Sequence, residues 1–208
     1  MSKPGSLHVK VSMMYGGKST YLIHLVEALG RAEKILYINH ASDTRDELLS
    51  THSNINIEAV ISKYATVIKL DALEDLWIHM SDKDIESYPV ICIDEGQFFP
   101  DLYEGVLHFV EDLGKEVYVV GLKGDYKRKR FGGIADLLEI SDTFSTLDSA
   151  TLCDRCCSRS DQRGQERKYN KALFTHRVDD TSGQQVEIGA DNYIPVCREC
   201  YLFLNNNR

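Results

Sequence analysis

Long apolar segments are missing from this chain of 208 residues, and so is a surplus of basic residues. No apolar run approaches the roughly 20 residues that a membrane-spanning helix needs. The 24 lysine and arginine residues are outnumbered by 32 aspartate and glutamate residues, which gives a net charge of −8. A general nucleic-acid binder needs a basic face to neutralise phosphates. The composition therefore disfavours both membranes and nucleic acids as partners.

A secretory signal is also missing, because the first residues, Met1 to Ser6, are polar and lack an apolar core. We therefore expect a cytoplasmic protein, in a reducing compartment where disulfides rarely persist. Of the six cysteines, Cys92 stands alone in an apolar run and five lie in the last quarter of the chain. Paired thiols in a reducing compartment indicate a metal site.

Short apolar strands alternate with helical patterns through residues 1–146. Strands are expected at 7–11, 35–38, 90–93 and 116–120, and helices at 22–29, 70–80 and 102–113. Two of the strands are continuously apolar, as in a parallel sheet that helices cover on both faces. We therefore predict an α/β domain over 1–146. A second, small domain is expected over 147–208, where helical periodicity fades and paired cysteines appear.

A glycine-rich segment joins the first strand to the first helix, and it reads Ser12-Met13-Met14-Tyr15-Gly16-Gly17-Lys18-Ser19-Thr20. It follows the phosphate-loop pattern G-x-x-x-x-G-K-[ST], with serine in place of the first glycine. Gly17 lets the backbone approach phosphates closely, and amide groups at the helix start point toward them. We expect Lys18 at the β- and γ-phosphates and the Ser19 hydroxyl at Mg²⁺. The alternative, a turn that binds nothing, is disfavoured because strand, loop and helix follow in the required order.

A second motif begins where the apolar strand Val90–Ile93 runs directly into Asp94 and Glu95. Such a strand brings a carboxylate beside the magnesium of a phosphate loop, so Asp94 is the expected magnesium partner. Glu95 starts from the same strand end but points differently, which makes it the expected general base. We assign the next residues, Gly96 and Gln97, to the phosphate side of the site. A solvated strand end is the alternative for two such acids alone.

These two motifs do not by themselves decide the reaction. A base at position 95 can take a proton from a substrate hydroxyl, as in a kinase, or from water, as in an ATPase. Phe98 follows closely and offers a flat apolar surface on which a nucleobase can stack. Core packing of Phe98 and Phe99 is an equally good interpretation of their composition.

The third motif consists of two C-x-x-C pairs, Cys153 with Cys156 and Cys197 with Cys200. They supply four thiolates, the number that a closed tetrahedral zinc site requires. With four ligands filled, the metal is expected to be structural and not catalytic. Cys157 is a spare thiol, and unpaired buried cysteines are the disfavoured alternative.

Together these motifs resemble the zinc-containing thymidine kinases, over nearly the whole chain from Val9 to Tyr201. The specific segments are Met14–Thr20, Asp43-Thr44-Arg45 with Thr51-His52, Ile93–Asp101, Leu122–Phe131 and both cysteine pairs. The resemblance implies an α/β fold with a P-loop (RecA-like) parallel sheet and flanking helices, plus a small zinc-binding lasso domain. It also implies transfer of the γ-phosphoryl group of ATP to the 5′-hydroxyl of thymidine or deoxyuridine.

The resemblance also assigns roles to single residues. Glu95 matches the catalytic base, Lys18 and Ser19 match phosphate and magnesium contacts, and Arg45 and Arg128 match arginines near the phosphates. The implied nucleoside pocket is lined by Met14, Phe98, Leu122, Tyr126, Thr175, Ile188 and Tyr193. Phenylalanine is usual in the family where Tyr126 stands, and aspartate is usual where Lys123 stands.

The family further implies a homotetramer, feedback binding of thymidine triphosphate, and a loop from Arg159 to Tyr193 that closes over the nucleoside like a lasso. Two rival functions stay open. A P-loop ATPase stimulated by DNA shares both nucleotide motifs with the kinase. A zinc-knuckle binding module with a degenerate nucleotide site is favoured only by Ser12.

Overall fold

The computed structural model describes residues 4–43, 57–163, 170–179, 184–185 and 192–206. Six strands form one sheet in the order β3-β2-β4-β5-β1-β6, and every neighbouring pair is parallel. The strands are β1 Ser6–Ser12, β2 Ile35–His40, β3 Ala65–Leu70, β4 Val90–Ile93, β5 Glu116–Leu122 and β6 Thr143–Thr146. A single strand, β5, separates the strand that leads to the phosphate loop from the strand that leads to Asp94. The predicted parallel α/β sheet is confirmed.

The four strands expected from the sequence all form, and two further strands of this sheet were missed. These are the outer strands β3 and β6, whose side chains are mostly half-buried or exposed. An edge strand buries less of its surface than a central one, so it carries a weaker apolar signal.

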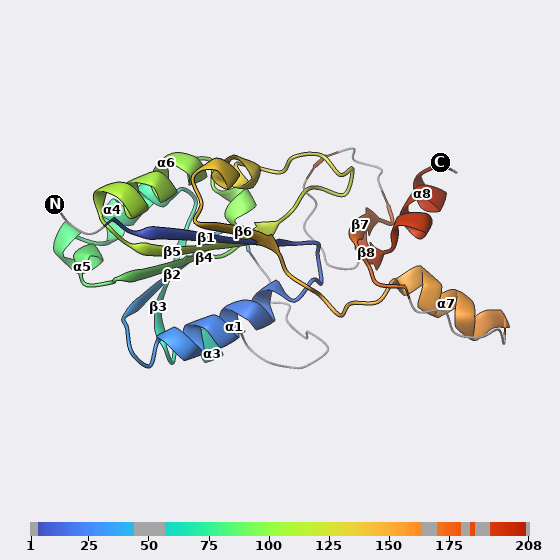
Figure 1. Cartoon of the computed structure of the whole chain (residues 1–208), viewed down its shortest axis with the longest axis horizontal. Coiled ribbons are helices and arrows are strands. Elements are labelled where there is room, and N and C mark those ends of the chain that lie inside the picture. Colours follow the sequence, from blue (N-terminus) through green and yellow to red (C-terminus); the bar gives the residue numbers. More distant parts are fainter. Residues whose placement is uncertain (1–3, 44–56, 164–169, 180–183, 186–191, 207–208) are drawn as a thin grey trace.

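Helices cover both faces of the sheet, as Figure 1 shows. One face carries α1, Lys18–Leu29, and α3, Ile57–Ile61. The opposite face carries the short helices α4 Leu76–His79, α5 Asp82–Glu86 and α6 Leu102–Leu107, with the 3-10 segment Ile134–Glu139. Two apolar clusters fill the layers between sheet and helices.

Two of the predicted helices differ from their expected form. The helix expected over 70–80 was wrong at its start, because Leu70 is the last residue of β3. Only a 3-10 turn, Leu73–Asp75, and α4 are helical there. The helix expected over 102–113 forms as α6 followed by a turn of π-helix, His108–Asp112.

A second lobe lies beyond the carboxyl ends of the central strands (Figure 1). It contains the antiparallel pair β7 Phe174–Arg177 and β8 Tyr193–Val196, together with α7 Asp154–Arg163 and α8 Arg198–Asn206. Helix α7 projects away from the body of the molecule and was not expected from its polar sequence. Of the described helices, none is both long and apolar enough to cross a membrane.

Candidate functional site

The glycine-rich segment between β1 and α1 forms a compact turn at the carboxyl edge of the sheet. Gly17 caps α1 with φ 83°, a left-handed conformation that favours glycine. The Ser12 hydroxyl donates to the carbonyl oxygen of Gly16 at 3.2 Å. A Cβ added to Gly16 would lie 1.7 Å from this hydroxyl oxygen. Ser12 therefore fills the space beside Gly16, and its hydrogen bond joins the start of the turn to Gly16.

The backbone of the same turn is hydrogen-bonded both to the second lobe and to the linker that leads to it. The backbone N–H of Met14 donates to the Thr175 hydroxyl at 3.1 Å. The hydroxyl of Thr151, in the linker between the lobes, donates to the carbonyl oxygen of Tyr15 at 2.7 Å. The predicted residues Met14 and Thr175 are thus in direct contact.

The other predicted residues of the turn differ in their exposure to solvent. Met13 and Lys18 are buried, with 4% and 6% exposure. Ser19, the second residue of α1, is half-buried and Thr20 is exposed. A cavity of about 650 Å³ adjoins the turn on its outer side; it is lined by Tyr15, Gly16, Gly17, Thr20, Tyr21, His24 and residues 147–151 of the linker.

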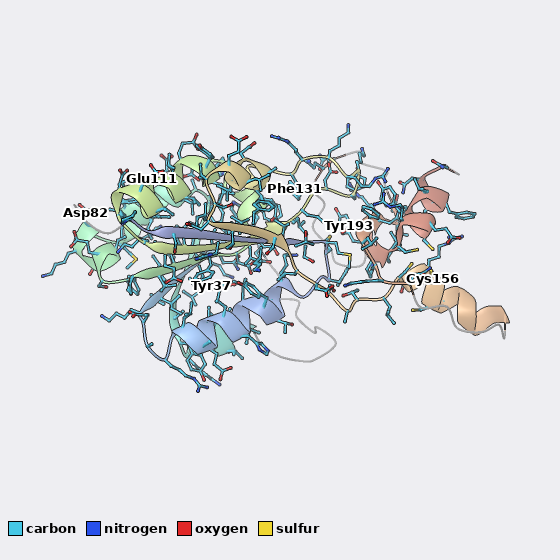
Figure 2. The ribbon with its side chains drawn as sticks, in the orientation of Figure 1. Tyr37, Asp82, Glu111, Phe131, Cys156 and Tyr193 are labelled. Atoms are coloured by element: carbon cyan, nitrogen blue, oxygen red, sulfur yellow. The ribbon has the colours of Figure 1, made fainter. Side chains whose placement is uncertain are left out.

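Asp94 follows β4 directly, and both of its carboxylate oxygens are held. Oδ1 accepts the backbone N–H of Glu95 at 2.8 Å, and Oδ2 accepts the hydroxyl of Tyr37 at 2.9 Å. Tyr37 comes from the neighbouring strand β2 and lies between the sheet and α1 (Figure 2). The carboxylate is buried at the edge where the parallel strands end.

Glu95 has φ 51°, in the left-handed region that non-glycine residues seldom occupy. Such conformations cluster at functional sites, where the surrounding structure maintains them. Its Oε1 lies 4.0 Å from the Lys18 ammonium, and both side chains are about 6–7% exposed. The phosphate-loop cation and the candidate base therefore meet in one buried place.

Gln97 holds the second oxygen of Glu95. Its amide nitrogen donates to Oε2 of Glu95, and its amide oxygen accepts the backbone N–H of Leu122 at 2.9 Å. The two bonds fix the orientation of the amide, because a backbone N–H can only donate. The structure thus places Gln97 against the carboxylate of Glu95. Gly96, buried behind it, packs against Val119.

Phe98 lies outside the core and is half-buried, whereas the next residue, Phe99, is 1% exposed and belongs to the core. The ring of Phe98 is framed by His40 and Phe131, each with its centroid 5.4 Å away. Figure 2 shows Phe131 at the edge of the sheet that faces the second lobe. One aromatic surface is thus held firmly at the carboxyl edge of the sheet.

Tyr126 is buried between the lobes. Its hydroxyl contacts the carbonyl oxygen of Gln184 at 3.4 Å, and its own carbonyl oxygen accepts the Tyr201 hydroxyl at 2.8 Å. The fully buried guanidinium of Arg177 lies 4.9 Å from the ring of Tyr126 and 5.9 Å from the ring of Tyr193. The hydroxyl that distinguishes Tyr126 from phenylalanine therefore reaches the loop of the second lobe.

Arg128 is directed toward the second lobe. It has φ 61°, and its guanidinium lies 4.3 Å from the ring of Tyr201 and 5.6 Å from that of Phe174. Lys123 and Arg198 also face the Phe174 ring, at 5.2 and 4.9 Å. Desolvation lowers the pKa of Lys123, and the charge of Arg198 lowers it further. The contacts of Arg128 are therefore with aromatic rings of the second lobe.

The four cysteines of the two C-x-x-C pairs come together, with all their sulfur atoms within 4.8 Å of one another. The sulfur of Cys156 lies 3.8 Å from that of Cys197 and 3.6 Å from that of Cys200. Zn–S bonds of about 2.3 Å in a tetrahedron place sulfurs about 3.8 Å apart, so the cluster fits zinc. Burial raises the pKa of the Cys200 thiol, so deprotonation needs a cation that compensates the charge.

A side chain not singled out from the sequence supports this cluster. The amide nitrogen of Asn170 lies 3.5 Å from the sulfur of Cys156 and 3.9 Å from that of Cys197. The backbone carbonyl oxygen of Asn170 accepts the backbone N–H of Cys153 at 2.8 Å. Three of the four predicted ligands are thus oriented by one residue.

Some predicted positions lie outside the described residues. They include Arg45 and Ile188, and also Thr44, Thr51, His52 and most of the loop between 164 and 191.

A family model described as "Thymidine kinase" matches residues 5–201. The chain is 33% identical over 203 residues to "Thymidine kinase, cytosolic" of Bos taurus, covering 95% of this chain and 72% of the relative. It is 32% identical over 204 residues to "Thymidine kinase a" of Arabidopsis thaliana, covering 95% and 75%. A Myxoma virus (strain Uriarra) relative named "Thymidine kinase" is also 32% identical over 204 residues, covering 96% and 97%.

Proposed function

Because the chain belongs to the thymidine kinase family, whose members phosphorylate thymidine with ATP, we propose that it catalyses in-line phosphoryl transfer with Glu95 as general base. In this reaction Glu95 takes the proton of the 5′-hydroxyl of thymidine or deoxyuridine. The hydroxyl oxygen then bonds to the γ-phosphorus of ATP, and the bond from that phosphorus to the β–γ bridging oxygen breaks. The products are the nucleoside monophosphate and ADP.

The observation that carries the proposal is the 4.0 Å separation between the Lys18 ammonium and the Glu95 carboxylate. A phosphate-loop lysine contacts the β- and γ-phosphates, so the γ-phosphate must come to this place. A base must lie within hydrogen-bonding reach of the hydroxyl that it deprotonates. Donor phosphate and acceptor hydroxyl therefore meet between these two side chains.

The donor side of the site is the turn from Ser12 to Thr20. Its backbone amides and the start of α1 face the triphosphate, and Lys18 balances the charge of the β- and γ-phosphates. Ser19 and Asp94 offer a hydroxyl and a carboxylate, the hard oxygen donors that Mg²⁺ prefers. When bound there with ATP, the ion would neutralise charge that develops on the phosphoryl oxygens.

The acceptor side is formed by Phe98 and the second lobe. The framed ring of Phe98 offers a stacking surface for the pyrimidine base, and we assign Met14 and Leu122 to the same pocket. Thr175 and Tyr193 approach from β7 and β8. We assign Zn²⁺ to the four cysteines as a structural ion that joins the start of α7 to the segment where β8 ends and α8 begins, because the four thiolates fill a tetrahedral site.

The role of Glu95 as general base is tested by Glu95→Gln. This change keeps the shape of the side chain and leaves an oxygen that can accept the hydrogen bond from the Gln97 amide. We expect turnover to fall by about 10²–10⁴-fold, with ATP binding nearly unchanged. Glu104→Gln, at an exposed position on α6, is the matched control and should behave as the wild type. Unimpaired turnover in the Glu95 variant would remove it from the role of base.

One assay separates this proposal from the DNA-stimulated ATPase. ADP release that requires thymidine supports the kinase, whereas release stimulated by single-stranded DNA supports the rival. We also propose a cytosolic location, in line with the name of the bovine relative, a homotetramer, and feedback binding of thymidine triphosphate. Size-exclusion chromatography and inhibition by thymidine triphosphate test the last two.

A further inference from the structure

A buried hydroxyl touches the carboxylate that we assign to magnesium, and neither the family motifs nor the mechanism above uses it. The Tyr37 hydroxyl donates to Oδ2 of Asp94 at 2.9 Å. Tyr37 is 3% exposed and Asp94 is 4% exposed, so water competes little for this bond.

The sheet sets this contact. Strands β2 and β4 are parallel neighbours, and Tyr37 is paired with Cys92. Side chains two residues apart on a strand share a face, so Asp94 continues on the face of Cys92, where Tyr37 also lies. The ring of Tyr37 packs in the cluster below α1, with Leu22 and Val26. The phenol is therefore held rigidly while its hydroxyl extends to the edge of the sheet.

The hydrogen bonds restrict how the carboxylate can turn. Oδ1 is engaged by the backbone N–H of Glu95 and Oδ2 by the hydroxyl of Tyr37. A carboxylate has about four acceptor positions, so each oxygen keeps capacity for a metal ion or a metal-bound water. Without the hydroxyl, Oδ2 would lose this bond, and the orientation of the carboxylate would be less restricted.

We infer that Tyr37 is a positioning residue that holds the Asp94 carboxylate in the orientation needed to receive the divalent cation of the donor nucleotide. The inference rests on the proposed role of Asp94. Outer-shell partners of this kind orient metal-binding carboxylates, and their loss costs roughly 10–100-fold in metal affinity. The ring of Tyr37 packs in the core, and its hydroxyl contacts the Asp94 carboxylate.

The direct test is Tyr37→Phe, which keeps the packed ring and removes only the hydroxyl. Mn²⁺ is titrated into the protein with ADP, and free Mn²⁺ is followed by its paramagnetic resonance signal. We expect the Kd for Mn²⁺ to rise about tenfold. The Mg²⁺ concentration that gives half-maximal rate should rise in parallel, while the KM for thymidine stays within about twofold of the wild type.

The matched control is Tyr88→Phe, which removes a hydroxyl that donates to Thr66 at 3.0 Å, away from the nucleotide motifs. It should leave Mn²⁺ binding unchanged. A Kd for Mn²⁺ unchanged in Tyr37→Phe, with a raised Kd in Asp94→Asn, overturns the inference and leaves the role of Asp94 intact. Unchanged binding in Asp94→Asn overturns both.

A double variant separates positioning from a general effect on folding. If Tyr37 acts through Asp94, then Tyr37→Phe should have little further effect on Mn²⁺ binding when Asp94 is already asparagine. A purely structural role would give the same weakening in both backgrounds, and that result would overturn the inference.

Discussion

The side-chain oxygen of Gln97 accepts the backbone N–H of Leu122 at 2.9 Å, and this bond directs the amide nitrogen of Gln97 toward Glu95. The candidate base is therefore fixed through a side chain that is itself anchored at the end of β5. Lys18 lies 4.0 Å from the other oxygen of Glu95, and in the proposed mechanism it contacts the phosphates of ATP. Gln97 restrains the carboxylate of Glu95 through Oε2.

The first prediction concerns Gln97→Met, which retains length and volume but loses both hydrogen bonds. We expect kcat to fall roughly tenfold or more, because a hydrogen bond to a charged group is worth about 1.5–3 kcal/mol. ATP binding should change little. Steady-state kinetics with a calorimetric ATP titration check both quantities, and a normal kcat would show that Glu95 does not depend on this amide.

Gly121→Ala tests the same relationship without altering Gln97. A Cβ at this position would lie 2.5 Å from Oε1 of Gln97 and 2.2 Å from Cδ1 of Ile134. We expect a loss of kcat comparable to that of Gln97→Met, since the amide must shift. Gly133→Ala is the control, because the nearest atom to its added Cβ is 3.7 Å away. Equal activity in both alanine variants would contradict the prediction.

Phe98→Leu addresses the acceptor pocket. Stacking of a base on an aromatic ring is worth about 1–3 kcal/mol, so the KM for thymidine should rise about tenfold. The KM for ATP should stay the same, because Phe98 lies outside the phosphate turn. The control is Phe144→Leu on β6, which is also half-buried and packs against the core. A KM for thymidine that moved equally in both variants would indicate a general loss of packing.

Asn170→Asp should weaken the metal site, because it brings a carboxylate close to two thiolates. We expect about 10–100-fold weaker binding of Zn²⁺, measured by competition with a chromophoric chelator. The Co²⁺-substituted protein would report the same change in its thiolate charge-transfer bands. Asn205→Asp, on α8 of the same lobe, controls for altered stability. Zinc affinity equal to that of the wild type would separate Asn170 from the site.

Lys115 gives a prediction about pH. Its buried ammonium donates to the carbonyl oxygens of Ile85 and Glu86 at 2.9 and 3.1 Å. Desolvation lowers the pKa of Lys115, partly opposed by the charge of Glu86. The unfolded chain then binds more protons than the folded one between the lowered pKa and the ordinary value of 10.5.

The contribution of Lys115 to stability should therefore rise as pH increases through its folded pKa. Urea unfolding of the wild type and Lys115→Met at about pH 7 and about pH 10 checks this. The difference in unfolding free energy should move in favour of the wild type at the higher pH. A difference that stays constant would contradict the assignment.

The sequence was most informative where the chemistry lies in contiguous residues. The turn that ends in Lys18, the acids that follow β4 and the two cysteine pairs are local patterns, so their element context and the sulfur cluster could be predicted. The edge strands β3 and β6 were missed because their half-exposed side chains leave a weak periodic signal.

Tyr37 and Asn170 were missed for a different reason. Tyr37 lies 57 residues from Asp94, and only the pairing of β2 with β4 brings them together. Within its strand it reads as one more apolar residue. Asn170 lies in a polar stretch with no periodic pattern. Its contacts with the cysteines form only because the folded chain brings residue 170 back beside them. Contacts of this kind depend on tertiary pairing, which local sequence does not encode.

Two of the hydrogen bonds that tie the phosphate turn to later parts of the chain use the backbone N–H of Met14 and the carbonyl oxygen of Tyr15. The turn contributes only main-chain atoms to these two bonds. A change of side chain at position 14 or 15 therefore removes neither the donor nor the acceptor. The side-chain groups that these two bonds need are the hydroxyls of Thr175 and Thr151. The attachment of the turn therefore depends on two threonine hydroxyls far along the chain and not on the side chains of Met14 and Tyr15.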